Sequence, residues 1–162
     1  MTTRNLTLTS LFATLLFISS YFKLPIGMVP VTTQTFFVVI IGLTLPPLHA
    51  FFATSISALL QIIFQNVLPS VTFGFILGFI LCATLISWGK QFTSTTLKLS
   101  VLVAIGSLCI YAIGVPYFVW LTNGKYTLLS ALSITMTPFL IGDTIKAIAS
   151  IMIAKRLTKL NR

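Results

Sequence analysis

The sequence predicts an all-α polytopic membrane protein, a single bundle of six transmembrane helices that occupies residues 1–162. Three observations predict it: 57% of the residues are hydrophobic, only 7% are charged, and the mean hydropathy is +1.08. A typical soluble domain carries about 25% charged residues. Because this chain has too few polar groups to cover a water-exposed surface, we expect lipid to solvate its apolar side chains.

The apolar runs are separated by Pro, Gly and polar residues, which are typical of breaks between helices. The predicted helices occupy residues 5–22, 32–45, 48–65, 72–89, 99–121 and 138–157. Thr137 is expected to cap the sixth helix, with Pro138 in its first helical position. Residues 127–136 are ambiguous, because they suit either an interfacial turn or the start of a longer sixth helix. No small-x-small cleavage site clearly ends the first run, so we expect a retained helix rather than a signal peptide.

The basic residues predict the orientation of this bundle. With six spans both termini lie on one side, and that side would hold most of the positive charge. The basic residues on that side would be Arg4, Lys90, Lys98, Lys155, Arg156, Lys159 and Arg162, whereas Lys23 and Lys125 would lie on the other side. The positive-inside rule therefore predicts cytoplasmic termini in a plasma or inner membrane. Anionic membrane lipid is the partner that the net charge of +9 favours over nucleic acid.

The sequence lacks the residues that several kinds of chemistry require. It contains neither a G-x-x-x-x-G-K-[ST] motif for ATP nor a His/Cys/Glu cluster for a metal. With one carboxylate it also lacks a pair of acids for acid–base catalysis. The two cysteines, Cys82 and Cys109, lie deep in apolar runs and are expected to act as small hydrophobes. We therefore expect a protein that is not an enzyme and uses no cofactor.

The only acidic residue, Asp143, is the first candidate for a binding site. It lies in an apolar helix, and Lys146 follows three residues later, so both project from the same helical face. A charge inside the bilayer costs roughly 2.5–3.5 kcal/mol on insertion scales, and such residues usually serve a function. The alternative is a structural ion pair that only holds two helices together.

Other polar residues near the predicted outer face are weaker candidates. Thr33 and Gln34 belong to a run of four hydrogen-bonding side chains, residues 32–35, that enters the second helix. They suit either a pocket mouth or helix capping. Asn66, with Gln61 and Gln65, suits a ligand contact or an ordinary interfacial position.

The fourth and fifth helices carry the remaining candidates. Gly74 and Gly78 in the run from Thr72 to Phe79 form a G-x-x-x-G pattern, which favours close helix packing, although a gap facing a ligand is the alternative. Tyr111, together with Tyr117 and Trp120, suits a ligand contact or an aromatic belt at the membrane surface.

Four segments, taken in order, resemble motifs of the BioY family. Residues 24–43 (LPIGMVPVTTQTFFVVIIGL) resemble its PVPxTxQTxxVxxxGL segment, and residues 138–146 (PFLIGDTIK) resemble its PFxxGDxxK motif. Residues 72–79 (TFGFILGF) and 114–120 (GVPYFVW) are similar to two further segments. The sequence departs from the family in its short connection at residues 66–71, in Phe73 and in Pro46.

The resemblance implies a biotin transporter, the substrate-binding component of an energy-coupling factor (ECF) transporter. Such a component captures biotin at the outer face. An ECF transmembrane coupling protein and cytoplasmic ATPase subunits then energise it. The resemblance places Asp143 and Lys146 in the biotin site, and Gln34, Thr33, Asn66, Thr72 and Tyr111 are the further expected contacts. Two other functions stay open: uptake of another small vitamin-like anion, and a noncatalytic membrane assembly subunit.

Overall fold

Six α-helices account for most of the chain in the computed structural model, which describes residues 3–24, 29–93 and 95–160. The elements follow in the order α1 (Thr3–Ser19), β1 (Lys23–Leu24), β2 (Val31–Thr32), α2 (Gln34–Thr44), α3 (Pro47–Gln65), α4 (Phe73–Gly89), the 3-10 turn η1 (Lys90–Phe92), α5 (Thr96–Leu121) and α6 (Leu128–Leu160). Strands β1 and β2 pair antiparallel. Part of the expected loop between the first two helices, residues 25–28, lies outside the described residues.

The predicted breaks between helices are confirmed where Pro, Asn and Gly have a local role. Pro47 takes the first position of α3, where its missing N–H has no intrahelical acceptor to lose. Asn66 ends α3 in the left-handed conformation, with φ of 47°. Asn123 and Gly124 also have positive φ and end α5.

The sixth helix is longer than predicted, and its expected start is wrong. The ambiguous residues 127–136 fall almost wholly within α6, which begins at Leu128, so Thr137 and Pro138 lie inside this helix. Its two arms, Leu128–Thr137 and Gly142–Arg156, meet at 55°. Pro138, which has no backbone N–H to donate to the preceding turn, lies in the interval between these two arms. Asp143 therefore lies directly after the bend.

By length and composition, three helical segments could each cross a membrane: Pro47–Gln65, Phe73–Phe92 and Thr96–Leu121. The bent pair in α6 makes a fourth if it forms one span. The prediction of six helices agrees with the described residues, but six spans are not established. A span takes about 20 residues, whereas α1 has 17 and α2 has 11.

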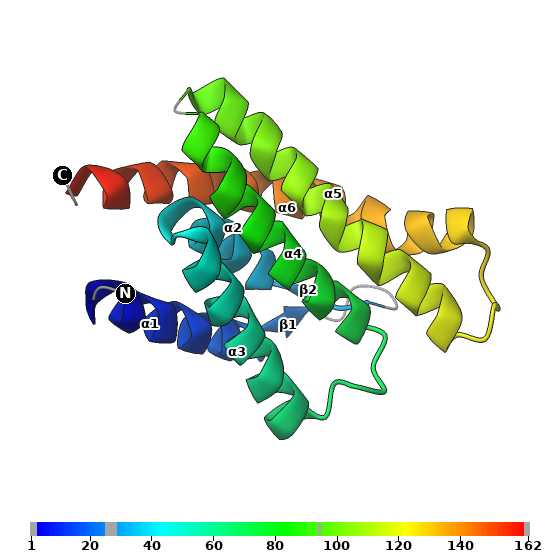
Figure 1. The fold of residues 1–162 in the computed structure, drawn as a ribbon. Helices are drawn as coiled ribbons and strands as arrows, with labels where there is room; N and C mark the ends of the chain where they lie inside the picture. The colour runs from blue at the N-terminus through cyan, green and yellow to red at the C-terminus, as the bar shows by residue number, and fades with distance from the viewer. Residues whose placement is uncertain (1–2, 25–28, 94, 161–162) are drawn as a thin grey trace.

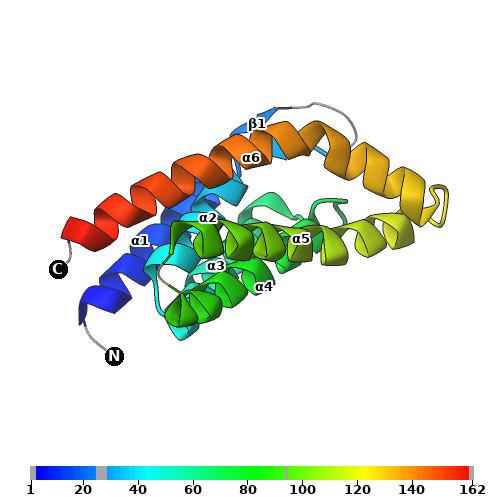
Figure 2. The same cartoon turned by 90° about the horizontal axis from the view of Figure 1, so that it is seen from above.

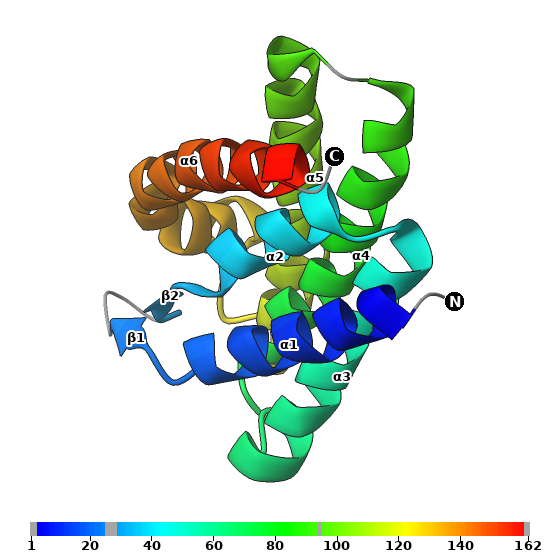
Figure 3. The same cartoon turned by 90° about the vertical axis from the view of Figure 1, so that its left-hand side faces the viewer.

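The short helix α2 lies at the centre of the bundle. It contacts α1, α3, α4 and α6, and α4 in turn packs on α3 and α5. Figure 1 shows both termini at the same end of the molecule, and Figure 2 shows α6 along one face with α4 and α5 on another side. In Figure 3 α2 lies between α6 and α1. Because its neighbours enclose it, almost all of its second half is buried.

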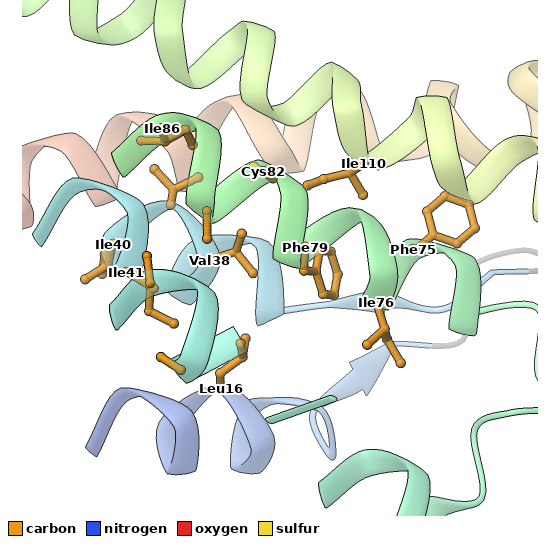
Figure 4. Packing of buried hydrophobic residues seen from close by; sticks show 14 of the residues in the cluster. Leu16, Val38, Ile40, Ile41, Phe75, Ile76, Phe79, Cys82, Ile86 and Ile110 are labelled. Atoms are coloured by element: carbon orange, nitrogen blue, oxygen red, sulfur yellow. The ribbon is translucent and has the colours of Figure 1, made fainter. Parts of the chain in front are cut away.

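All six helices contribute side chains to the hydrophobic core, with mostly small residues from α3 and α6 and mostly larger ones from the other helices, part of which Figure 4 shows. Cys82 is fully buried in this core, and both cysteines are free, as expected for small hydrophobic residues. The G-x-x-x-G pattern serves the packing of α4 on α5. A Cβ atom on Gly78 would lie 2.7 Å from Ile110 Cα, so only glycine allows this approach.

Candidate ligand-binding site

A cavity opens between the polar start of α2, the bend in α6 and the apolar sides of α4 and α5. The space in it that a water-sized molecule can occupy is about 50 Å³, so a vitamin-sized ligand would need the walls to move apart. The lining residues are Val29, Pro30, Thr32, Gln34, Thr35, Thr72, Phe75, Ile76, Phe79, Ile110, Tyr111, Thr135, Asp143 and Lys146.

The carboxylate of Asp143 is the centre of the polar wall. Its Oδ1 atom accepts hydrogen bonds from Thr35 Oγ1 at 3.0 Å and from Lys146 Nζ at 3.1 Å. Its Oδ2 atom accepts one from the Tyr111 hydroxyl at 2.8 Å. A carboxylate offers about four acceptor positions. Three are taken by the protein, so one position on Oδ2 is left for another donor.

Lys146 joins α6 to the start of α2. Besides Asp143, its ammonium group donates to the backbone carbonyl of Thr32 at 2.7 Å and to Thr35 Oγ1 at 3.3 Å. An ammonium group has three donors, and these three contacts use all of them. Lys146 therefore balances the charge of Asp143 and holds the two helices in register.

The opposite wall of the cavity is apolar and partly aromatic. Figure 4 shows Phe75, Ile76 and Phe79 on α4 with Ile110 on α5 nearby. The ring of Phe75 meets that of Tyr111 edge to face, with centroids 6.3 Å apart. Tyr111 thus has an apolar contact with Phe75 and a polar contact with Asp143. The site can hold a molecule with N–H donors on one side and an apolar body on the other.

A buried pair of amides lies behind the polar wall. Gln34 lines the cavity, and its Nε2 atom donates to Gln61 Oε1 at 3.0 Å. Gln61 Nε2 in turn contacts Ser57 Oγ at 3.3 Å. These contacts connect the first residue of α2 to the middle of α3.

The structure brings most of the residues predicted for the site together. Asp143, Lys146, Gln34, Thr72 and Tyr111 all line the cavity. Thr33 and Asn66 are not among its lining residues. No group of three or more His, Cys, Asp or Glu residues that could hold a metal occurs in the part of the chain that the structure describes.

Local backbone structure explains why Thr33 and Asn66 lie elsewhere. Thr35, in the first turn of α2, points to Asp143 and Lys146, and Thr32 in β2 meets Lys146 with its backbone carbonyl. Thr33 is exposed on another side, where its hydroxyl donates to the Ser19 carbonyl at 3.3 Å. Asn66 is exposed at the C-cap of α3, where its backbone conformation ends the helix.

Thr135 was not among the predicted candidates, whereas Thr35 and Gln61 were candidates with capping or an interfacial position as the alternative. Thr35 belongs to the polar run that was recognised, but Thr32 lies in β2 rather than in α2, so no helical spacing within this run identifies Thr35. Thr135 is buried and lines the cavity from the arm of α6 that precedes the bend. Nothing local in the sequence distinguishes Gln61 from Gln65, because only the packing of α3 on α2 makes them different.

Comparison with known proteins assigns the chain to a family. The family model described as the BioY family matches residues 1–162. The chain belongs to the BioY family. Among the similar proteins, "Biotin transporter BioY2" of Lactococcus lactis subsp. cremoris is 35% identical over 155 residues, 89% of this chain and 84% of that protein. "Biotin transporter BioY" of Thermotoga maritima is 33% identical over 168 residues, 97% of each chain.

The fold of this BioY-family chain also matches a solved structure. A crystal structure described as the S-component for biotin from an ECF-type ABC transporter aligns with a TM-score of 0.86. The alignment covers 98% of this chain and 95% of that chain at 22% sequence identity. At this identity the match establishes a shared fold, the helical S-component fold with its several apolar helices.

Proposed function

We propose that this chain is the biotin-binding component of an ECF-type transporter. It captures biotin at the outer face of the cell membrane, and a partner ATPase module energises its release. Family membership and relatives named as biotin transporters support this function. On this proposal the chain is a transport component rather than an enzyme, and biotin is its cargo rather than a cofactor.

The observation that carries the proposal is the single carboxylate with a remaining acceptor position in a largely apolar cavity. Among the residues that the structure describes, Tyr111 is the one donor to Asp143 Oδ2. The ureido group of biotin carries two N–H donors, and one of them can occupy the second position on Oδ2. A hydrogen bond to a charged acceptor in a site of low dielectric is stronger than one in water.

The remaining parts of biotin match the other walls. The Phe75 and Phe79 rings line the side that suits the sulfur-containing ring and the alkyl chain. Lys146 can meet a biotin oxygen by giving up its longest contact, the 3.3 Å hydrogen bond to Thr35 Oγ1. Its other two contacts would still hold α6 to α2. Gln34, Thr72 and Tyr111 are the further proposed contacts, whereas Thr33 and Asn66 are not part of this proposed site.

The proposed membrane arrangement is one domain, residues 1–162, with six crossings and both termini in the cytoplasm. The excess of Lys and Arg on the terminal side supports the orientation. Although α2 is short, its neighbours enclose it, so it need not itself match the thickness of the lipid.

The proposed partners are an ECF transmembrane coupling protein, cytoplasmic ATPase subunits and membrane lipid. On α1, Ser10 and Thr14 are four residues apart and both exposed, whereas Thr9 and Ala13 are buried. The first pair is therefore the small-residue face of α1 that a partner helix can approach closely.

The test is the thermal stability of the purified protein in detergent, with and without biotin. A ligand at one hundred times its Kd stabilises the native state by about 2.7 kcal/mol, so Tm should rise. We expect Asp143→Asn to remain folded and to lose this rise. Asn66→Gly, which keeps the left-handed conformation outside the cavity, is the matched control and should keep it.

Other outcomes would support the alternatives. If Asp143→Asn fails to fold, the ion pair is structural, and the chain is better described as an assembly subunit. If the folded wild-type protein does not respond to biotin but responds to another vitamin-like anion, the chain takes up that anion instead.

A further inference from the structure

Behind the cavity, three buried polar side chains form a continuous hydrogen-bonded chain. Gln34, Gln61 and Ser57 are only 4%, 2% and 0% exposed. Gln34 Nε2 donates to Gln61 Oε1 at 3.0 Å, and Gln61 Nε2 donates to Ser57 Oγ at 3.3 Å. Of the three, only Gln34 lines the cavity.

The donor-to-acceptor direction of these hydrogen bonds determines which atom of the Gln34 amide is left for a ligand. A primary amide has an acceptor end and a donor end of nearly the same shape. Turning the Gln34 amide over by itself would direct its oxygen at Gln61 Oε1, and two acceptors cannot bond to each other; only a turn of both amides, with the Ser57 hydroxyl as donor, would reverse the direction. With Nε2 committed to Gln61, Gln34 Oε1 has no hydrogen-bond partner among the residues that the structure describes. This oxygen is therefore available as a second acceptor in the cavity that Asp143 also lines.

We infer that Gln61 is a positioning residue for the ligand. Together with Ser57 it holds the Gln34 amide so that its carbonyl oxygen faces the cavity. Gln34 and Thr35 are consecutive residues, and Thr35 bonds to Asp143, so two acceptors lie at the same end of the site. A pair of acceptors suits a ligand with two N–H donors on one ring, such as a cyclic urea. The inference rests on the proposed binding of biotin.

Gln65 provides a matched comparison on the same helix. It lies one turn after Gln61 and is also an amide with polar contacts. Its partners are Ser20 Oγ and Lys23 Nζ rather than a cavity residue, and Gln65 does not line the cavity. A general effect of removing an amide from α3 should therefore appear at both positions. A positioning effect should appear only at Gln61.

The experiment is a double-mutant cycle that measures biotin affinity calorimetrically on the full chain in detergent. The variants are Gln34→Met, Gln61→Met and the double variant, with Gln65→Met as the control. We expect Gln61→Met to weaken biotin binding about tenfold, equivalent to about 1.4 kcal/mol. In the Gln34→Met background, Gln61→Met should have no further effect on affinity, because Gln61 affects the ligand only through Gln34. Gln65→Met should stay within about twofold of wild type.

A conservative variant separates positioning from folding. Gln61→Glu keeps an oxygen that can accept from Gln34 Nε2, so it should restore affinity to within about threefold of wild type. It should nevertheless lower the Tm measured without biotin, because a buried carboxylate is costly to desolvate. A purely structural role would reduce affinity and Tm together.

Three outcomes would overturn the inference. Gln61→Met could bind biotin like wild type, or weaken binding equally with and without Gln34. In either case, the proposed function still holds as long as the wild-type protein binds biotin. If wild type does not bind biotin, the proposed function and this inference both fail. Should Gln61→Met not fold, Ser57→Ala tests the same chain from its far end, with a loss of about threefold expected only when Gln34 is present.

Discussion

Thr35 and Asp143 lie 108 residues apart in the sequence, and a 3.0 Å hydrogen bond joins Thr35 Oγ1 to Asp143 Oδ1. The same Thr35 oxygen accepts from Lys146 at 3.3 Å. One hydroxyl at the start of α2 thus contacts both members of the ion pair on α6. Because these three groups lie in one cavity wall, a change in any of them should affect ligand binding.

Thr35→Val should weaken biotin binding about three- to tenfold. Valine has nearly the same shape but can neither donate to Asp143 nor accept from Lys146. Thr33→Val is the matched control, because Thr33 is the same residue type two positions earlier and does not line the cavity. Calorimetric titration of both variants checks the prediction. A larger loss at Thr33 than at Thr35 would contradict the placement of the site.

Tyr111→Phe should weaken biotin binding by a similar factor and also lower the free energy of unfolding, by up to about 3 kcal/mol. The substitution keeps the ring contact with Phe75 but removes the donor to Asp143 Oδ2. A hydrogen bond to a charged group contributes about 1.5–3 kcal/mol. Tyr117→Phe is the control, because its hydroxyl donates to the Leu68 carbonyl away from the cavity lining. Equal binding by Tyr111→Phe and wild type would show that Oδ2 is not where the ligand binds.

The ion pair between Asp143 and Lys146 should show strong coupling in stability. The two side chains are 18% and 20% exposed and 3.1 Å apart. Each single variant, Asp143→Asn or Lys146→Met, should destabilise the protein by about 1–3 kcal/mol, less than for a fully buried pair, since one partly buried charge loses its partner. The double variant should be more stable than Lys146→Met, yet still fail to bind biotin. Additive losses in Tm would indicate that the two charges do not stabilise each other.

Gly78→Ala should destabilise the protein by about 1–3 kcal/mol, because overpacking forces neighbouring segments apart. The added Cβ would lie 2.7 Å from Ile110 Cα, and a backbone atom cannot move away as a flexible side chain can. Gly142→Ala is the control for stability, since nothing lies within 4 Å of its Cβ position. Thermal unfolding in detergent measures both. Because Ile110 lines the cavity, Gly78→Ala should also weaken biotin binding.

The proposed orientation predicts which positions a membrane-impermeant thiol reagent reaches in intact cells. In a background with Cys82 and Cys109 replaced by alanine, Lys125→Cys should be labelled from outside. Lys98→Cys should be labelled only after the membrane is opened. Both residues are exposed in the structure, so burial would not mask either of them. Labelling in the reverse order would place the termini outside the cell.

The sequence by itself determined the class of protein and predicted the residues at the centre of the candidate site. High hydropathy with few charges predicts a membrane protein, and Asp143 with Lys146 stands out because an isolated acid in an apolar helix is costly. Spacing of three residues placed both on one face of α6. These properties depend on composition and local helix geometry, which can be calculated without knowing what the helix packs against.

Only the tertiary structure decided which side chains face that pair. The rotation of α2 about its axis is set by its contacts with α4 and α6, and it directs Thr35 rather than Thr33 to Asp143. The same packing places Gln61 behind Gln34 and leaves Gln65 near the surface. The burial of α2, a helix of 11 residues enclosed by its neighbours, also depended on the fold. Such choices depend on contacts between residues far apart in the chain, which no local pattern encodes.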